Sequence, residues 1–348
     1  MLYTAEKIIS LHEEKQEMRN RDFAISIGIS EAELIAAYCT TEKAKRLEAD
    51  VKTFLEHAPK LGTVMALTRN EEAVHEITGC FEKVVQSQHV PLTLGEIDLR
   101  IFAKQWKFGF EYEMVILGQP TKSLQFFDQY GVAVFKLYSK DATNMEEWDN
   151  LVNKLLHKEQ SSILDISTTP PPQAEHDITD IDIDKFQEHW RNMTDVHQLH
   201  QIISELKINR HDAVKYAGNE FANELKIDAI EMMLNRVVQQ EIPIMCFVGN
   251  KGCIQIFSGK IKNIKAMGPW INVLDQKFHL HLLMSGVEKV WCVRKPTSDG
   301  YVSSLEVFNK NNDMVIQFFG VRKEGQKERQ DWRSLLKSFS QNQEIAIT

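Results

Sequence analysis

The sequence lacks the features that mark disulfide-rich, zinc-binding and membrane-spanning proteins. Its five cysteines are Cys39, Cys80, Cys246, Cys253 and Cys292. No two of them form a Cys-x-x-Cys pair, and an odd, scattered set favours neither a disulfide framework nor a structural zinc site. No apolar run approaches the roughly 18 residues that a membrane span needs, and residues 1–21 are charged throughout. We therefore expect a cytoplasmic protein that does not insert into a membrane.

Motifs for several common enzyme chemistries are missing as well. We find no Gly-x-Gly-x-x-Gly or Gly-x-x-x-x-Gly-Lys-Ser/Thr loop for nucleotide phosphates, no His-Glu-x-x-His and no Gly-x-Ser-x-Gly. The net charge is −8, whereas nucleic-acid-binding proteins normally carry a basic surface. These absences argue against nucleotide-dependent enzymes, zinc proteases, common hydrolases and nucleic-acid partners.

Length and composition divide the chain into two parts of similar size. A chain of 348 residues exceeds one typical domain and suits two. Residues 160–184 hold three consecutive prolines, small polar residues and an acidic run, which is typical of an interdomain connector with a stiff polyproline element. We therefore predict a first module over 1–159, a linker over 160–184 and a second module over 185–348.

The two parts resemble each other along their length. VMALTRNEEAVHEITG matches IMCFVGNKGCIQIFSG with Asn70 aligned on Asn250, and SLQFFDQYGVAVFKLY from Ser123 matches SLEVFNKNNDMVIQFF from Ser304. Each copy starts with helical patterns, continues with alternating β-branched and aromatic residues, and closes with an apolar helix that contains a tryptophan. The sequence predicts an α+β fold, a tandem duplication of a module with antiparallel β-sheets and flanking helices.

His197 occupies an unusual place in a predicted helix. In MTDVHQLHQIISELK, Thr194 or Asp195 is a suitable helix N-cap, and apolar residues from Val196 to Leu206 recur at helical spacing. His197 lies roughly opposite this apolar stripe, so it faces either water or something docked against the helix. It is therefore either a solvated surface histidine or a metal ligand, for which neutral imidazole is a common donor.

Cationic and aromatic residues follow in the second half. Asn209 can cap a second helix that starts at Arg210, where a cation is unfavourable unless an anion pairs with it. The segments VWCVRKPTSDG and FFGVRKEGQ add Lys295, Phe318, Phe319 and Arg322. Each of these could be a solvated or structural strand residue. Together they offer cations for two haem propionates and flat apolar walls.

The first half lacks an equivalent of His197, because the repeat alignment places Met18 there. It has instead Arg100 and Phe102 in GEIDLRIF, which we expect on one side of a strand. The duplication is therefore predicted to be functionally asymmetric, with a single site shared by the two copies. His75, in AVHEITG, is more consistent with a half-buried structural histidine than with a ligand.

Four segments carry a resemblance to a known family. They are GEIDLRIFAKQWKFGF, MTDVHQLHQII, VWCVRKPTSDGYVSSLEVF and QFFGVRKEGQ. They resemble the bacterial hemin transport and hemin-degrading factor family, the cytoplasmic proteins of haem-uptake operons, and the similarity covers nearly the whole chain. The resemblance implies two similar halves of stacked antiparallel sheets with flanking helices, and a haem cleft between helix and sheet.

The resemblance also implies a set of site residues. His197 matches the family's axial ligand of the haem iron. Arg100 matches its distal arginine, which reaches the iron side through water and is the expected catalytic residue. The other expected haem contacts are Phe102, Arg210, Phe247, Lys295, Gln317, Phe319 and Arg322. Relatives have tyrosine at the position of Phe319, so one hydroxyl hydrogen bond is missing here. His200 or His211 stays open as an alternative ligand.

Two functions in haem uptake and iron acquisition follow from this resemblance. The chain could be an enzyme that degrades haem b and releases its iron with electrons from an external donor. It could instead be a carrier that accepts haem from an inner-membrane importer and delivers it to a separate haem oxygenase. A duplicated module for another flat, anionic ligand is a third alternative. We expect a monomer in each case.

Overall fold

The structure, a computed structural model, describes residues 3–87, 90–116, 118–169, 182–322 and 325–345. The chain divides into two compact units. Unit 1 comprises Met1–Arg69, His75–Pro171 and Asn250–Gln255, and unit 2 comprises Asn70–Val74, Pro172–Gly249 and Ile256–Thr348. Residues 170–181 of the predicted linker lie outside the described residues, and the linker boundaries stay a prediction.

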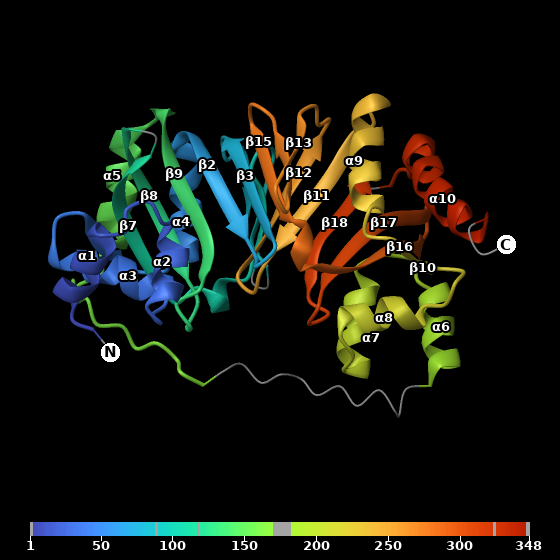
Figure 1. The fold of residues 1–348 in the computed structure, drawn as a ribbon, viewed down its shortest axis with the longest axis horizontal. Helices are drawn as coiled ribbons and strands as arrows, with labels where there is room; N and C mark the ends of the chain where they lie inside the picture. The colour runs from blue at the N-terminus through green and yellow to red at the C-terminus, as the bar shows by residue number, and fades with distance from the viewer. Residues whose placement is uncertain (1–2, 88–89, 117, 170–181, 323–324, 346–348) are drawn as a thin grey trace. The chain divides into compact units, whose positions relative to one another are not determined.

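Unit 1 consists of antiparallel strands with helices packed against them (Figure 1). Its helices are α1 (Ala5–Glu13), α2 (Asn20–Ser26), α3 (Glu31–Ala37), α4 (Val51–His57), α5 (Met145–Leu155) and the short η1 (Tyr38–Thr40), η2 (Ala58–Lys60) and η3 (Ala103–Gln105). Its main strands pair in the order β1 (Ala44–Leu47), β7 (Phe108–Ile116), β8 (Gln119–Phe127), β9 (Ala133–Thr143), β2 (Gly62–Arg69) and β3 (Ala73–Gly79). A smaller group pairs in the order β6 (Asp98–Ile101), β5 (Leu92–Leu94) and β4 (Lys83–Val85).

Unit 2 repeats this arrangement. Its helices are α6 (Ile183–Arg191), α7 (Gln198–Leu206), α8 (Arg210–Tyr216), α9 (Ala229–Gln239), α10 (Gln330–Ile345) and the short η5 (Met284–Gly286). Its main strands pair in the order β10 (Ala222–Leu225), β16 (Val287–Thr297), β17 (Gly300–Asn309), β18 (Met314–Gly320), β11 (Ile244–Gly249) and β12 (Cys253–Gly259). The smaller group is β15 (Phe278–Leu283), β14 (Trp270–Leu274) and β13 (Ile264–Met267). Equivalent strands occupy equivalent positions, so the predicted α+β duplication is confirmed.

The aligned asparagines of the two copies have the same structural role. Asn70 donates its side-chain amide to the carbonyl oxygens of Gly249 and Val315, at 3.2 and 2.8 Å. Asn250 donates in the same manner to the carbonyl oxygen of Val134, at 2.9 Å. Each side chain also caps its own tight turn by accepting two backbone N–H groups. An asparagine has both an acceptor and two donors, which explains why both copies use it.

Helices α6 to α8 cover one side of the unit 2 sheet and position the candidate site (Figure 1). Trp190 of α6 and Leu199 of α7 are fully buried in the same cluster as Val293 and Phe308 of the sheet. Helices α9 and α10 lie on the other side, where Trp332 is fully buried. Burial of these large side chains, at about 25 cal/mol per Å² of apolar area, holds the helices against the sheet.

Helix α7 begins later than the sequence indicated. Its first residue is Gln198, and His197 is its N-cap without a side-chain capping bond. The Gln198 side chain instead accepts the backbone N–H groups of Thr194 and Asp195, at 2.8 and 3.2 Å. These bonds stabilise a turn in competition with the helix. The predicted apolar stripe is also shorter, because Leu206 is exposed.

Three further expectations about side-chain placement need correction. Strand β6 ends at Ile101, so Phe102 lies just beyond the strand, at the start of η3. Phe318 is buried on the face of β18 opposite to Phe319, because successive residues of a strand alternate. His75 is fully buried rather than half-buried.

No single helix among the described residues is long and apolar enough to cross a membrane. Helix α2 and the segment Glu31–Thr40, which contains α3 and η1, are long and apolar enough only when taken together, and they are bent by 101° relative to each other. Most residues of α3 are buried in the core of unit 1, which accounts for their apolar composition.

Candidate functional site

Four of the expected haem contacts lie on one face of the unit 2 sheet. Phe247 of β11 pairs with Gln317 of β18, and Gln317 pairs in turn with Glu306 of β17. Phe319 lies two residues further along β18, and its ring centroid is 5.1 Å from that of Phe247. Lys295 of β16 extends over the same face, with Nζ 5.1 Å from the Phe319 ring centroid. We call Phe247, Lys295, Glu306, Gln317 and Phe319 the site face.

A buried carboxylate joins two of the expected cations. Glu306 has no exposed side-chain surface, and it accepts bonds from Arg210 Nε and Nη2 at 3.1 and 2.9 Å. Lys295 Nζ donates to Oε1 of the same carboxylate at 2.6 Å, and the Ser304 hydroxyl donates to that oxygen at 2.8 Å. Glu306 is the anion that the sequence required beside Arg210 at the start of α8.

The charges of this cluster perturb one another. Burial lowers the pKa of Lys295 to about 8, although Glu306 opposes that effect. Burial by itself would raise the pKa of Glu306, but Arg210 and Lys295 together hold it well below the usual value. At neutral pH the cluster therefore holds two cations and one anion.

His197 is exposed and has one ring nitrogen already engaged. Its side chain is 90% exposed, and Nδ1 lies 2.7 Å from Oδ1 of Asp195, whose oxygen also accepts the His197 backbone N–H at 2.7 Å. A carboxylate at Nδ1 favours the proton there and leaves the lone pair on Nε2. The turn is anchored where the Ser298 N–H donates to the Thr194 carbonyl at 2.8 Å. The imidazole thus presents an oriented donor atom to solvent.

Arg322 contributes a further cation near this turn. Its guanidinium donates to the carbonyl oxygen of Gln326 at 3.2 Å. The pKa of Asp195 is lowered chiefly by the hydrogen bond from the His197 backbone, and the charge of Arg322 adds to that shift. The axial candidate and a propionate-binding candidate therefore lie within electrostatic range of each other in unit 2.

Arg100 and Phe102 belong to unit 1 and are described separately. Arg100 is half-buried, pairs with Asp98 two residues earlier on the same side of β6, and donates to the Leu99 carbonyl oxygen at 3.1 Å. Phe102 lines a cavity of about 520 Å³ that also has Lys251 in its wall. Arg100 is therefore held in place by its own strand, which suits a fixed cation.

The alternative histidine ligands differ in accessibility. His200 is exposed on α7. His211 is buried, with its ring centroid 5.2 Å from that of Phe308 and 6.1 Å from that of Trp291, and burial lowers its pKa. His211 could reach a ligand only after α8 moves, whereas His200 could reach one without such a change.

In unit 1, the positions equivalent to Arg210 and Gln317 are occupied by a different ion pair, Glu31 and Lys136. Glu31 starts α3 as Arg210 starts α8, and each follows a polar N-cap residue. Lys136 donates to Glu31 at 2.5 Å, and both side chains are nearly fully buried. Lys136 pairs with Gln125 on the sheet, as Gln317 pairs with Glu306. The ion pair of the unit 1 counterpart therefore has no net charge.

Sequence reasoning missed the residues that orient the site. Glu306 and Ser304 were not proposed as site residues, and Asp195 was considered only as a helix N-cap. The alternation in VSSLEVF places Ser304 and Glu306 on one face, and the unsatisfied cation at the start of α8 was a signal for a buried acid.

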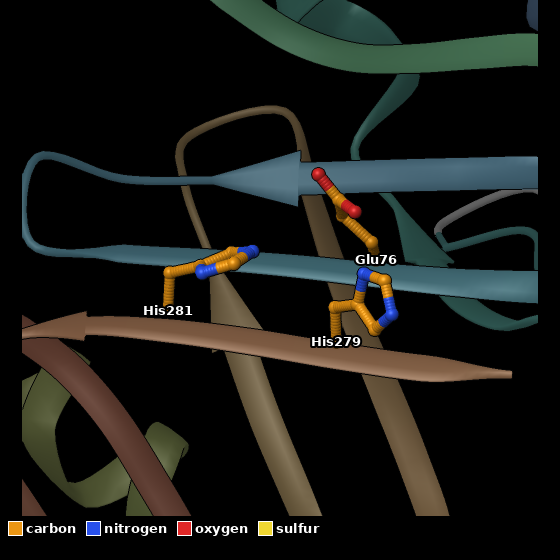
Figure 2. Close-up of side chains that lie close together, drawn as sticks. All are labelled: Glu76, His279 and His281. Atoms are coloured by element: carbon orange, nitrogen blue, oxygen red, sulfur yellow. The ribbon is translucent and has the colours of Figure 1, made fainter. Parts of the chain in front are cut away.

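A second pair of histidines lies in the smaller strand group of unit 2. Figure 2 shows His279 and His281 on one side of β15, with ring centroids 6.2 Å apart. Nδ1 of His281 is 2.6 Å from Oδ1 of Asn272, which fixes its tautomer. Glu76, labelled in the same figure, belongs to unit 1. The alternation in FHLHLL places the two rings on one face of the strand, but the sequence analysis did not consider them as a site.

The chain belongs to the family described as the Haemin-degrading HemS.ChuX domain, which matches residues 28–155 and again residues 207–339. It is 37% identical to the hemin transport protein HemS of Yersinia enterocolitica over 328 residues, 94% of each chain. These two findings confirm the family indicated by the sequence segments, and the double match agrees with the duplication.

Solved structures of similar proteins agree with this assignment. Holo-PhuS, a heme-binding protein from Pseudomonas aeruginosa, superposes with a TM-score of 0.92 at 36% identity, covering 96% of this chain and 97% of that one. The heme degrading enzyme ChuS of Escherichia coli O157:H7 gives a TM-score of 0.88 at 33% identity, covering 95% and 97%.

The residues of unit 2 fit a haem group by their chemistry. His197 supplies an oriented imidazole nitrogen, Arg210, Lys295 and Arg322 supply cations for carboxylates, and the site face adds aromatic walls. A large planar ligand with two anionic groups on one edge matches this donor set.

Proposed function

We propose that the chain binds haem b in the cytoplasm during haem uptake and iron acquisition, and that it degrades haem to release iron. The observation that carries this proposal is the Asp195–His197 pair, which presents an oriented nitrogen in the same unit as a buried cationic and aromatic site face. The relatives named as a heme-binding protein and as a heme degrading enzyme support it.

Haem, when bound, supplies the iron and the oxidative chemistry. The chain's own residues bind and orient it. His197 would supply the imidazole nitrogen that binds the iron, and Asp195 holds a proton on Nδ1 so that Nε2 stays available. Arg210, Lys295 and Arg322 bind the propionates by charge-assisted hydrogen bonds. The rings of Phe247 and Phe319 exclude water from one edge of the ligand.

In this proposal Arg100 and Phe102 would also contact the bound haem. Arg100 is held by Asp98 and by a backbone carbonyl, so its charge is already oriented. A fixed guanidinium can hold a water molecule and donate protons in hydrogen bonds without a rearrangement. Electrons come from an external donor in this proposal, because the sequence contains no nucleotide-binding motif of the common kinds.

Haem titration of the purified full chain tests the binding step. A Soret change that saturates near one equivalent is expected. His197→Ala should weaken binding or alter the coordination spectrum, whereas His200→Ala, an exposed neighbour on the same helix, should alter neither. An unchanged spectrum in His197→Ala would mean that His200 or His211, and not His197, binds the iron. Absence of saturation in the wild type would reject haem in favour of another flat anion.

A non-enzymatic carrier is the second candidate, and the name of PhuS as a heme-binding protein favours it. Such a carrier would receive haem from an inner-membrane importer and pass it to a haem oxygenase. To separate the two, the complex receives a reductant and oxygen with catalase present. Loss of the Soret band with a defined tetrapyrrole product supports degradation, and an intact band that transfers to added haem oxygenase supports the carrier. Catalase removes free peroxide, which bleaches haem without an enzyme.

A further inference from the structure

Glu306 is the least accessible charged group of the site face. It lies on β17, with no exposed side-chain surface, and each hydrogen bond of its carboxylate is to a cation or a hydroxyl of the same cluster. A buried carboxylate is tolerated only when it is paired and hydrogen-bonded, and Glu306 meets both conditions. The carboxylate is thus a fixed element around which Arg210 and Lys295 are arranged.

The hydrogen bonds to Glu306 fix the orientation of Arg210 and Lys295. Arg210 engages both carboxylate oxygens through Nε and Nη2, which leaves Nη1 without a bond to Glu306. Lys295 donates to Glu306 and to the Ser304 hydroxyl, at 2.6 and 3.2 Å. An ammonium group has three N–H donors, so one remains available. Each cation therefore keeps donor capacity for an incoming anion.

The cluster of Arg210, Lys295 and Glu306 differs in net charge from the equivalent ion pair in unit 1. Arg210 and Lys295 against Glu306 leave one positive charge, whereas Glu31 and Lys136 in unit 1 cancel. The repeat places the neutral Gln125 at the position of Glu306. Only the unit 2 cluster thus has an unbalanced charge, and one ligand carboxylate would balance it.

We propose that Glu306 is a positioning residue that fixes Arg210 and Lys295 and sets the cluster to accept one carboxylate group, and that Lys295 takes up a proton with that carboxylate at alkaline pH. The proposal rests on the proposed function, since the carboxylate is a porphyrin propionate. It adds a residue that touches neither iron nor ligand and an exchange of protons on binding.

The surroundings of Lys295 determine the direction of this exchange. The pKa of Lys295 lies near 8 because burial outweighs the attraction of Glu306, while Arg210 lowers this pKa and Glu328 raises it more weakly. A propionate adds negative charge beside the ammonium group, so bound Lys295 stays protonated to higher pH. Binding above pH 8 must then take up a proton.

The apo protein provides a test without porphyrin. The Cε resonance of Lys295, assigned with Lys295→Arg, is titrated by NMR in the wild type, Glu306→Gln and Glu306→Asp. We expect a pKa lower by at least about one unit in Glu306→Gln, because its anion is gone, and a value near the wild type in Glu306→Asp. Equal pKa values in Glu306→Gln and wild type would overturn the positioning role.

Proton uptake on binding gives a second, independent measurement in the wild-type chain. Calorimetric titration with zinc protoporphyrin, in buffers of different ionisation enthalpy, avoids the titration of water on ferric iron. Uptake should be near zero at pH 7 and should approach about one proton at pH 9. Lys295→Met should abolish it, and the dimethyl ester of the same porphyrin should show none.

The results of these experiments test the role of Glu306 and Lys295 separately from haem binding. Saturable binding with no uptake at pH 9, or equal uptake in Lys295→Met, contradicts the inference and leaves haem binding intact. Failure of both zinc protoporphyrin and haem to saturate contradicts the proposed function, while the apo titration still decides the role of Glu306.

Discussion

Replacing Asp195 with asparagine isolates the contribution of the carboxylate that orients His197. The amide oxygen can still accept the Nδ1–H bond now seen at 2.7 Å, but without the negative charge. Changes in a residue that orients a metal-binding histidine typically weaken metal affinity by about 10- to 100-fold. His197 and Asp195 are 90% and 54% exposed, so solvent screens the pair and the low end applies. We expect haem affinity to fall about 10-fold, which is about 1.4 kcal/mol.

The assay is the rate at which haem leaves the chain for an excess of apomyoglobin, together with the visible spectrum of the complex. Glu205→Gln is the matched control, because it removes the same charge from the neighbouring helix α7, where Glu205 bonds only Gln201. A double-mutant cycle sharpens the result: in a His197→Ala background, Asp195→Asn should have no further effect.

Two results would refute this reasoning. Asp195→Asn could release haem at the wild-type rate, which would mean that the carboxylate does not tune the ligand. It could also weaken binding equally with and without His197, which would mean that Asp195 acts through the general charge of the site.

Three other predictions concern buried charge and the site face. Lys136→Met leaves Glu31 buried without its cation and should lower the free energy of unfolding by about 3 kcal/mol; urea denaturation measures this, and a loss below about 1 kcal/mol would mean that water reaches Glu31. Because the pKa of Lys295 is about 8 in the folded chain and 10.5 at its ordinary value, the unfolded chain binds more protons between these limits, so unfolding free energy should rise with pH there relative to Lys295→Met. Identical slopes in both proteins would contradict this. Phe319→Tyr should tighten haem binding by up to about 10-fold through one added hydrogen bond, and a titration with equal or weaker affinity would exclude that bond.

Local patterns were sufficient to predict the duplication and the strand layout. Asn70 and Asn250 recur in matched turns because each turn needs an acceptor and donors at one short side chain. Alternation explains why Phe247, Gln317 and Phe319 share one face, since the side-chain period of a strand is two. The sequence interpretation did not apply this rule to β18, and it grouped Phe318 with Phe319.

The start of α7 could not be predicted in the same way. Thr194 and Asp195 are good N-caps in general, but here Gln198 binds their backbone N–H groups and Asp195 binds that of His197. These competing bonds depend on the anchor of the turn to Ser298, which is 104 residues further along the chain than Thr194. As a consequence His197 is the N-cap residue of the helix and not part of its polar side.

The sequence by itself determined that the chain is a tandem α+β duplication in which only the second copy has a histidine at the position of His197, because repeat order and strand alternation are local properties of the chain. Only the tertiary structure decided which charges meet. Arg210, Lys295 and Glu306 come from a helix and two strands up to 96 residues apart, and nothing in their local patterns indicates that one carboxylate serves both cations. The same holds for Glu31 and Lys136, which close the matching place in unit 1. A buried charge is unfavourable unless it is paired, and the pairing partners here come from segments that are far apart in the sequence, so only the tertiary structure identifies them. In our proposal, the remaining positive charge of the unit 2 cluster is what accepts an anionic ligand.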